Sequence, residues 1–133
     1  MARAARPGGK VIVGVPHVPS AQTRLPNRLN NAVPHHLTWW TTAALEALAS
    51  RAGLVNAQVQ PSPWSRTDRF IWWMARLSPV RCEQVHFRHS WAWHAATLVA
   101  ALGALAAYRL PVPAAANEEG VALLLVADRP EAA

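Results

Sequence analysis

Two adjacent histidines, His35 and His36, are the first candidates for acid–base chemistry in this sequence. A neutral imidazole accepts a proton near physiological pH, so either ring suits a general base acting on a hydroxyl or an amine. Neighbouring residues of an extended segment point in opposite directions, so at most one of the two faces a pocket. The structural alternative is that one ring bonds the loop backbone and the other is solvated. His17 is a similar case, and we expect it to contact a substrate.

Tryptophan is frequent here, at seven of 133 residues. Trp39 and Trp40 follow the paired histidines, and Trp72 and Trp73 form a second pair. Indole rings can line a pocket for an apolar or aromatic substrate, and we expect Trp39 and Trp40 to do so. Trp73 recurs with apolar neighbours at helical spacing, so the second pair fits a protein core better.

The sequence also holds a weak metal-ligand pattern, formed by Cys82, His86, His89 and His94. Structural zinc sites use tetrahedral Cys/His sets, usually as two closely spaced pairs. One cysteine with scattered histidines matches that pattern poorly, and we predict no metal site. The single cysteine also excludes an internal disulfide and is typical of a reducing compartment.

Composition predicts a single domain with its own core, because 52% of the residues are hydrophobic. The formal net charge of +6 comes from 13 Lys and Arg against 7 Asp and Glu. The arginines are scattered from Arg3 to Arg129 rather than clustered, so we predict no nucleic-acid partner. Residues 1–10 are small and basic with no signal-type apolar core after them, which favours a cytoplasmic location.

The elements that would position these side chains begin with a strand over residues 11–15. A Pro-Gly-Gly turn at 7–9 precedes it, and Pro16 ends it. The run is apolar at every position, which is typical of a strand covered on both faces. Such a strand usually has a neighbour on each edge, and one of these is not found in this chain. The long polar connection over 17–34 follows at the carboxyl end of the strand, where functional loops are common.

A helix is predicted over 42–52, with Thr41 as its N-cap and Gly53 after its last turn. Apolar and polar residues alternate over 55–59, which indicates a half-buried strand at a sheet edge. The helical residues expected to face the sheet are Leu45, Leu48 and Ala52.

Two further helices are predicted, over 66–77 and within 91–110, whereas 80–90 fits no element clearly. The apolar face of the first consists of Phe70, Trp73, Met74 and Leu77. The second is rich in alanine, with Trp91, Leu98, Leu102 and Leu105 on one side. A helix graded by size in this way is expected to pack on the protein. A membrane span, which needs about 20 residues, and an interfacial helix are the alternatives.

The last predicted strand covers 121–127 and is apolar throughout, which indicates a central place in a sheet. Residues 111–119 form the loop before it.

The order and spacing of these segments resemble the C-terminal part of a class I S-adenosylmethionine-dependent methyltransferase. The turn at 7–9 leads into a strand that ends in Val-Pro-His at 15–17, where the family typically has Val-Pro-Asn. The Val-Pro-His-His at 33–36, the following Trp39, and the helix end Arg-Ala-Gly at 51–53 match further family features. The resemblance covers residues 6–59 well.

The resemblance implies an α/β fold with a partial Rossmann-like methyltransferase sheet. Its strands would correspond to the family's fifth, sixth and seventh, with the antiparallel seventh between the others. Residues 10–60 and 120–130 would form the sheet within a single partial domain, 1–133, and 61–119 a helical insertion. The family's cofactor contacts lie in its first half and include a glycine-rich turn. The six glycines here form no Gly-x-Gly, so the N-terminal cofactor half is missing.

The implied activity is methyl transfer from S-adenosyl-L-methionine to a small-molecule, lipid or glycan acceptor, with His35 and His36 as catalytic residues. We expect this chain to be inactive alone and not to bind the cofactor by itself. One alternative is a non-enzymatic module that contacts anionic membrane through 91–110 and 66–77. Another is an interaction module whose sheet is completed by a second chain.

Overall fold

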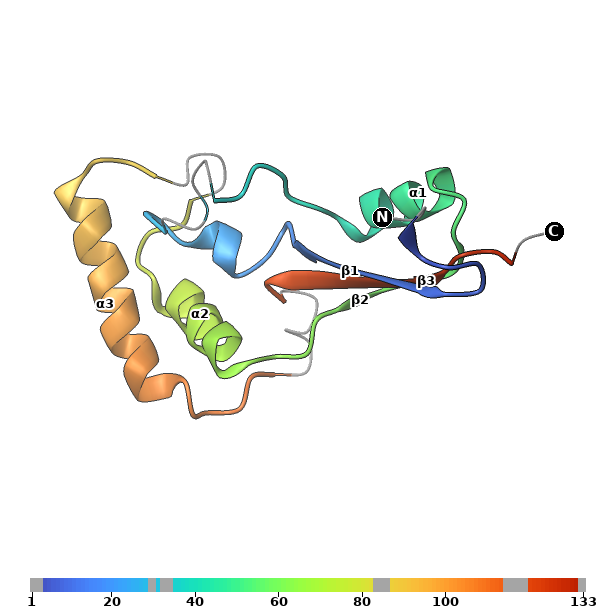
Figure 1. The fold of residues 1–133 in the computed structure, drawn as a ribbon. Coiled ribbons are helices and arrows are strands. Elements are labelled where there is room, and N and C mark those ends of the chain that lie inside the picture. The colour runs from blue at the N-terminus through green and yellow to red at the C-terminus, as the bar shows by residue number, and fades with distance from the viewer. Residues whose placement is uncertain (1–3, 29–30, 32–34, 83–86, 114–119, 132–133) are drawn as a thin grey trace.

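The computed structural model describes residues 4–28, 31, 35–82, 87–113 and 120–131 (Figure 1). The elements, in chain order, are β1 (Lys10–Pro16), the 3-10 helix η2 (Gln22–Arg24), α1 (Thr42–Arg51), β2 (Val55–Pro61), α2 (Arg66–Leu77), α3 (Trp91–Ala107) and β3 (Ala122–Asp128). Helix α1 lies beside the strands, whereas α2 and α3 lie beyond one end of them, with α3 outermost (Figure 1). The predicted α/β class is confirmed, and both α2 and α3 fall within the range predicted to be a helical insertion.

The three strands form one open sheet in the order β1–β3–β2. Strand β3 is antiparallel to both neighbours, so β1 and β2 run parallel to each other. A bulge between Val55 and Gln58 interrupts β2, and Asn56 within it has a φ of 52°. The last strand therefore lies between the other two, which is the order expected from the resemblance.

One core joins α1 to the sheet, through Leu45 and Ala49 on the helix and Leu123, Leu125 and Ala127 on β3. The Thr41 hydroxyl accepts a hydrogen bond from the Ala44 N–H at 3.2 Å, and Gly53 takes a φ of 67°, so both predicted ends of the helix are confirmed. The predicted sheet-facing set is only partly correct. Leu48 is 42% exposed and Ala52 is exposed too, because the contact with the sheet runs through positions 45 and 49, four apart.

The prediction that both faces of β1 are covered is wrong. Val11 is buried, but Ile12 is 61% exposed and Gly14 is exposed. Alternate residues of a strand point to opposite faces, and α1 covers only one of them. Among the described residues β1 pairs with β3 alone, so its other edge has no strand beside it.

A second core lies between η2, α2 and α3. Its buried residues are Ala21, Leu25, Ile71, Trp72, Met74, Ala75, Ala100 and Ala104. The polar connection over 17–34 thus contributes core residues, Ala21 and Leu25. The predicted face of α2 is also wrong in part: Leu77 is 42% exposed, whereas Ile71 and Trp72 are buried. Because the helix contacts both η2 and α3, its buried residues cover a different part of the helix surface from the predicted face.

Helix α3 packs on the protein, as predicted, but through its small residues. Ala96, Ala100 and Ala104 are at most 5% exposed. A Cβ built on Gly103 would lie 3.0 Å from the Leu77 Cδ1, so the helices approach closely there. The large residues expected to mark its packing side lie outward instead. None of the helices among the described residues has the length and hydropathy needed to cross a membrane.

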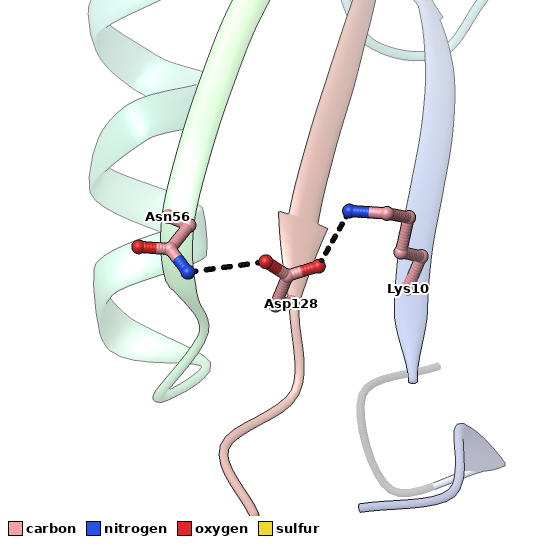
Figure 2. Close-up of polar contacts among 3 residues, drawn as sticks. All are labelled: Lys10, Asn56 and Asp128. Atoms are coloured by element: carbon pink, nitrogen blue, oxygen red, sulfur yellow. Dashed lines mark hydrogen bonds and ion pairs between the residues drawn. The ribbon is translucent and has the colours of Figure 1, made fainter. Parts of the chain in front are cut away.

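Asp128 links all three strands through its carboxylate (Figure 2). Its Oδ1 accepts from the Lys10 Nζ at 2.9 Å, and its Oδ2 accepts from the Asn56 Nδ2 at 3.1 Å. The hydrogen bonds from Lys10 and Asn56 lower the pKa of Asp128. The ionised carboxylate is therefore better stabilised in the folded chain than in the unfolded one.

Replacing Asp128 by asparagine should remove a pH-dependent part of the stability. A carboxyl whose pKa is lowered on folding stabilises the fold above its unfolded pKa, about 4, and this contribution is lost as pH falls through the folded pKa. Melting temperatures from pH 7 to pH 3 should show Asp128→Asn below the wild type at pH 7, with the gap closing below about pH 4. The exposed Glu46→Gln on α1 is the matched control, and a gap that stays constant with pH would contradict the prediction.

Candidate functional site at the carboxyl end of β1

His17 directly follows β1 and is buried. Its backbone N–H donates to the Val121 carbonyl at 3.1 Å, and its Nδ1 lies 3.0 Å from the Gly120 carbonyl oxygen. A carbonyl only accepts, so Nδ1 carries the proton, and a neutral ring then has a lone pair on Nε2. The structure therefore fixes His17 by its backbone and one ring nitrogen, and leaves Nε2 as the atom that can accept a proton. Its predicted role in substrate binding stays a prediction.

Trp40 is held against the end of β1 by its backbone. Its N–H donates to the Pro16 carbonyl at 3.0 Å, and its carbonyl accepts from the Val18 N–H at 2.9 Å. Its Nε1 donates to the Thr38 hydroxyl at 3.2 Å, and the ring packs against the core between α1 and the sheet. This double backbone contact places Trp40, the last residue of the segment 35–40, beside His17. The side chain of Trp40 contributes to the core.

His36 and Trp39 form a ring pair in the same segment. The ring centroids lie 5.0 Å apart with an interplanar angle of 81°, an edge-to-face contact. His36 is partly buried, whereas His35 is exposed. The Nδ1 of His36 is buried and has no hydrogen-bond partner among the described residues. The two histidines thus differ as expected for an extended segment, and His36 is the one turned toward the protein.

A small hollow of about 140 Å³ lies where β2 ends and β3 begins. It is lined by Ser62, Trp64, Asp68, Gly120, Val121 and Ala122. The Trp64 Nε1 is buried and has no hydrogen-bond partner in the described part of the chain. Gly120 belongs both to this hollow and to the bond with His17, which brings the hollow to the same end of the sheet as 35–40.

Trp64, Ser62 and Asp68 were not expected at a site. Ser62 and Trp64 lie between the predicted strand over 55–59 and the predicted helix over 66–77. The sequence signal that could have pointed to these residues is a Trp directly before the capping box of α2. In that box the Ser65 hydroxyl accepts from the Asp68 N–H, and the Asp68 carboxylate accepts from the Ser65 N–H.

The second tryptophan pair belongs to the core. The Trp72 and Trp73 rings meet edge to face with centroids 4.9 Å apart, Trp72 is buried, and Trp73 packs against the core of η2, α2 and α3. Neither residue lines the hollows described here, so the interpretation of this pair as core is confirmed.

The four residues of the weak metal pattern have other roles where they are described. The Cys82 Sγ donates to the Leu25 carbonyl at 2.9 Å, and burial raises the pKa of this thiol. The Nδ1 of His94 is 3.2 Å from the Asn27 Nδ2. His89 and His94 approach ring to ring at 6.0 Å, and His86 lies outside the described residues. No group of three or more His, Cys, Asp or Glu side chains is gathered for a metal within the described ranges.

No protein-family model matches this sequence, and neither a curated protein nor a solved structure matches it.

Proposed function

We propose that this chain is the sheet-forming C-terminal part of an S-adenosyl-L-methionine-dependent methyltransferase. The observation that carries the proposal is the strand order β1–β3–β2, with an antiparallel β3 between two parallel strands. This is the arrangement implied for the family's fifth, seventh and sixth strands. The proposal includes a cytoplasmic location and a small-molecule, lipid or glycan acceptor.

The bare side of β1 supports the proposal. The strand pairs with one described strand, Trp40 bonds its other edge only at Pro16, and Ile12 on the uncovered face is 61% exposed. Its partners in register on that face are Val126 for Ile12 and Leu124 for Gly14, and both are only partly buried. An apolar face beside a free edge fits further strands and a covering helix. In the proposal these come from the cofactor half, on the same or a second chain.

The residues at the carboxyl end of β1 suit the acceptor side of the reaction. Ligands of open α/β sheets bind beyond the carboxyl ends of the strands. The His17 Nε2 and the His36 ring are the proton acceptors at that end, for a hydroxyl or amine that loses a proton when it is methylated. The exposed His35 would serve only from the solvent side.

The described residues do not fit the cofactor itself. Gly14 lies within β1 rather than in a turn after it, and Gly8 and Gly9 precede that strand. No turn among the described segments repeats glycine in the way that lets backbone approach a nucleotide. We therefore assign no cofactor contact to this chain.

Isothermal titration of S-adenosyl-L-methionine into this chain should give no binding heat. The DNA upstream of the first codon, or a co-purifying chain, should encode a glycine-rich strand–turn–helix, and the combined protein should bind the cofactor. Tight binding by this chain alone would contradict the missing-half interpretation. The absence of such a segment from both places would contradict the methyltransferase proposal.

A further inference from the structure

The outward face of α3 is a continuous apolar ridge. Its exposed large residues, with exposed fractions of 58–88%, are Trp91, Leu98, Val99, Leu102 and Leu105. No Asp, Glu, Lys or Arg occurs within the helix. Single exposed apolar residues are ordinary, but a row of five along one helix marks an interaction surface. Helix α3 is also the outermost element of the fold (Figure 1).

An arginine-lined hollow lies beside the C-terminal end of α3. Its volume is about 350 Å³, and it is lined by Arg66 and Arg69 at the start of α2 and by Tyr108 and Arg109 just after α3. The Arg109 Nε donates to the Tyr108 hydroxyl at 3.2 Å. A hydroxyl that accepts in this way still has its own proton to donate. Asp68 is the acidic residue nearest in sequence, and its Oδ2 accepts from the Ser65 N–H at 2.7 Å.

We propose that α3 lies along the surface of an anionic phospholipid bilayer, with the ridge among the lipid chains and the arginine hollow on a lipid phosphate. Arg109 comes two residues after the last residue of α3, so the hollow adjoins the helix that carries the ridge. Guanidinium groups bind phosphate oxygens in bidentate pairs, and Tyr108 adds a further donor. An apolar helix face beside cationic side chains is the combination that an anionic membrane surface complements. This inference does not depend on the proposed methyltransferase function.

Vesicle sedimentation with the full chain tests the charge component. We expect binding to phosphatidylcholine vesicles that contain phosphatidylserine, and much weaker binding to phosphatidylcholine alone. Replacing Arg66 and Arg109 by glutamine should weaken binding to the anionic vesicles by about 25-fold, since each surface cation contributes about fivefold. The double variant of Arg6 and Arg51, both exposed and outside the hollow, removes the same charge and should bind at most a few-fold more weakly than the wild type.

A second pair of variants tests the ridge. Leu102→Ser with Leu105→Ser should remove most vesicle binding, because it takes two apolar side chains out of the membrane contact. Leu37→Ser with Leu48→Ser alters two leucines that are also exposed, at 76% and 42%, and should leave binding nearly unchanged. All four leucines are exposed, and circular dichroism checks that each variant is folded.

Four results would overturn the proposal. The first is equal loss of binding in the hollow variant and its charge-matched control. The second is binding of inorganic phosphate without any sedimentation with vesicles, which would make the hollow a site for a free anion. The third is a dimer in solution that dissociates when Leu102 and Leu105 are replaced by serine, since a second copy of the chain would then cover α3. The fourth is duplex DNA binding that the hollow variant abolishes while vesicle binding persists.

Discussion

Leu45→Ala should destabilise the fold by about 3 kcal/mol, the middle of the range for a fully buried leucine. Leu45 has no exposed surface and lies in the core that joins α1 to β3. Its truncation removes the contact with Leu123 and Leu125 and leaves a cavity that the neighbouring sheet cannot readily fill. A domain of this size has about 5–15 kcal/mol in total, so the loss would be a large share of it.

Urea denaturation provides the measurement for Leu45, with the free energy of unfolding extrapolated to water. Leu48→Ala is the matched control, because it makes the same change in the same helix at a side chain that is 42% exposed. We expect the control to cost less than about 1 kcal/mol. Equal losses from the two variants would mean that α1 does not rest on the sheet through Leu45.

Ala100→Leu should destabilise the contact between α3 and α2 by about 1–3 kcal/mol, because extra atoms are forced into a filled interface. Ala100 has no exposed surface, and Gly103 lies close to Leu77, so α3 and α2 are already in tight contact. A larger side chain at position 100 would push the two helices apart. Trp72 and Trp73 lie in this core, so their fluorescence should report the loosening together with the loss of stability.

Ala106→Leu is the control for Ala100→Leu. It makes the same substitution in the same helix at an exposed position, so the change in helix propensity is shared and only packing differs. The control should stay within about 0.5 kcal/mol of the wild type. If Ala100→Leu were equally stable, the alanine face of α3 would not be its packing face.

Local signals predicted the elements of this chain well. Thr41, Gly53 and the proline at the end of each of the first two strands set boundaries through backbone chemistry that depends on a few neighbouring residues. The expected strands over 11–15 and 55–59 both lie within observed strands, β1 and β2. The helix over 66–77 has the predicted bounds.

The faces of these elements were harder to predict, because burial depends on what lies opposite. The apolar run of β1 suggests cover on both sides, but in the described fold only α1 is there to provide it. On α3 the large residues suggest a packing side, yet close helix contact requires small ones, and Ala100 and Ala104 provide it. Sequence spacing predicts which residues share one face of a helix or strand, but it does not predict which element packs against that face.

The candidate site likewise has one part that local sequence predicted and another that depends on the tertiary fold. The segment 35–40 was expected at the end of β1 and is held there by Trp40. The hollow beside it combines residues 62–68 with residues 120–122, which come from two separate parts of the chain. No local pattern unites them, because the sheet order that brings β2 and β3 together decides their proximity.

The pairing of β1 with β3 also determines when this protein can fold during its synthesis. Lys10 and Asp128 are partners in register and stand 118 positions apart. As the ribosome works from the N-terminus, β1 emerges early and has to wait, unpaired and apolar, until β3 has left the exit tunnel. Pairing between segments so far apart in sequence slows folding and prolongs the exposure of aggregation-prone apolar segments. Efficient production of this chain should therefore respond to trigger-factor-type chaperones and to slower, cooler expression.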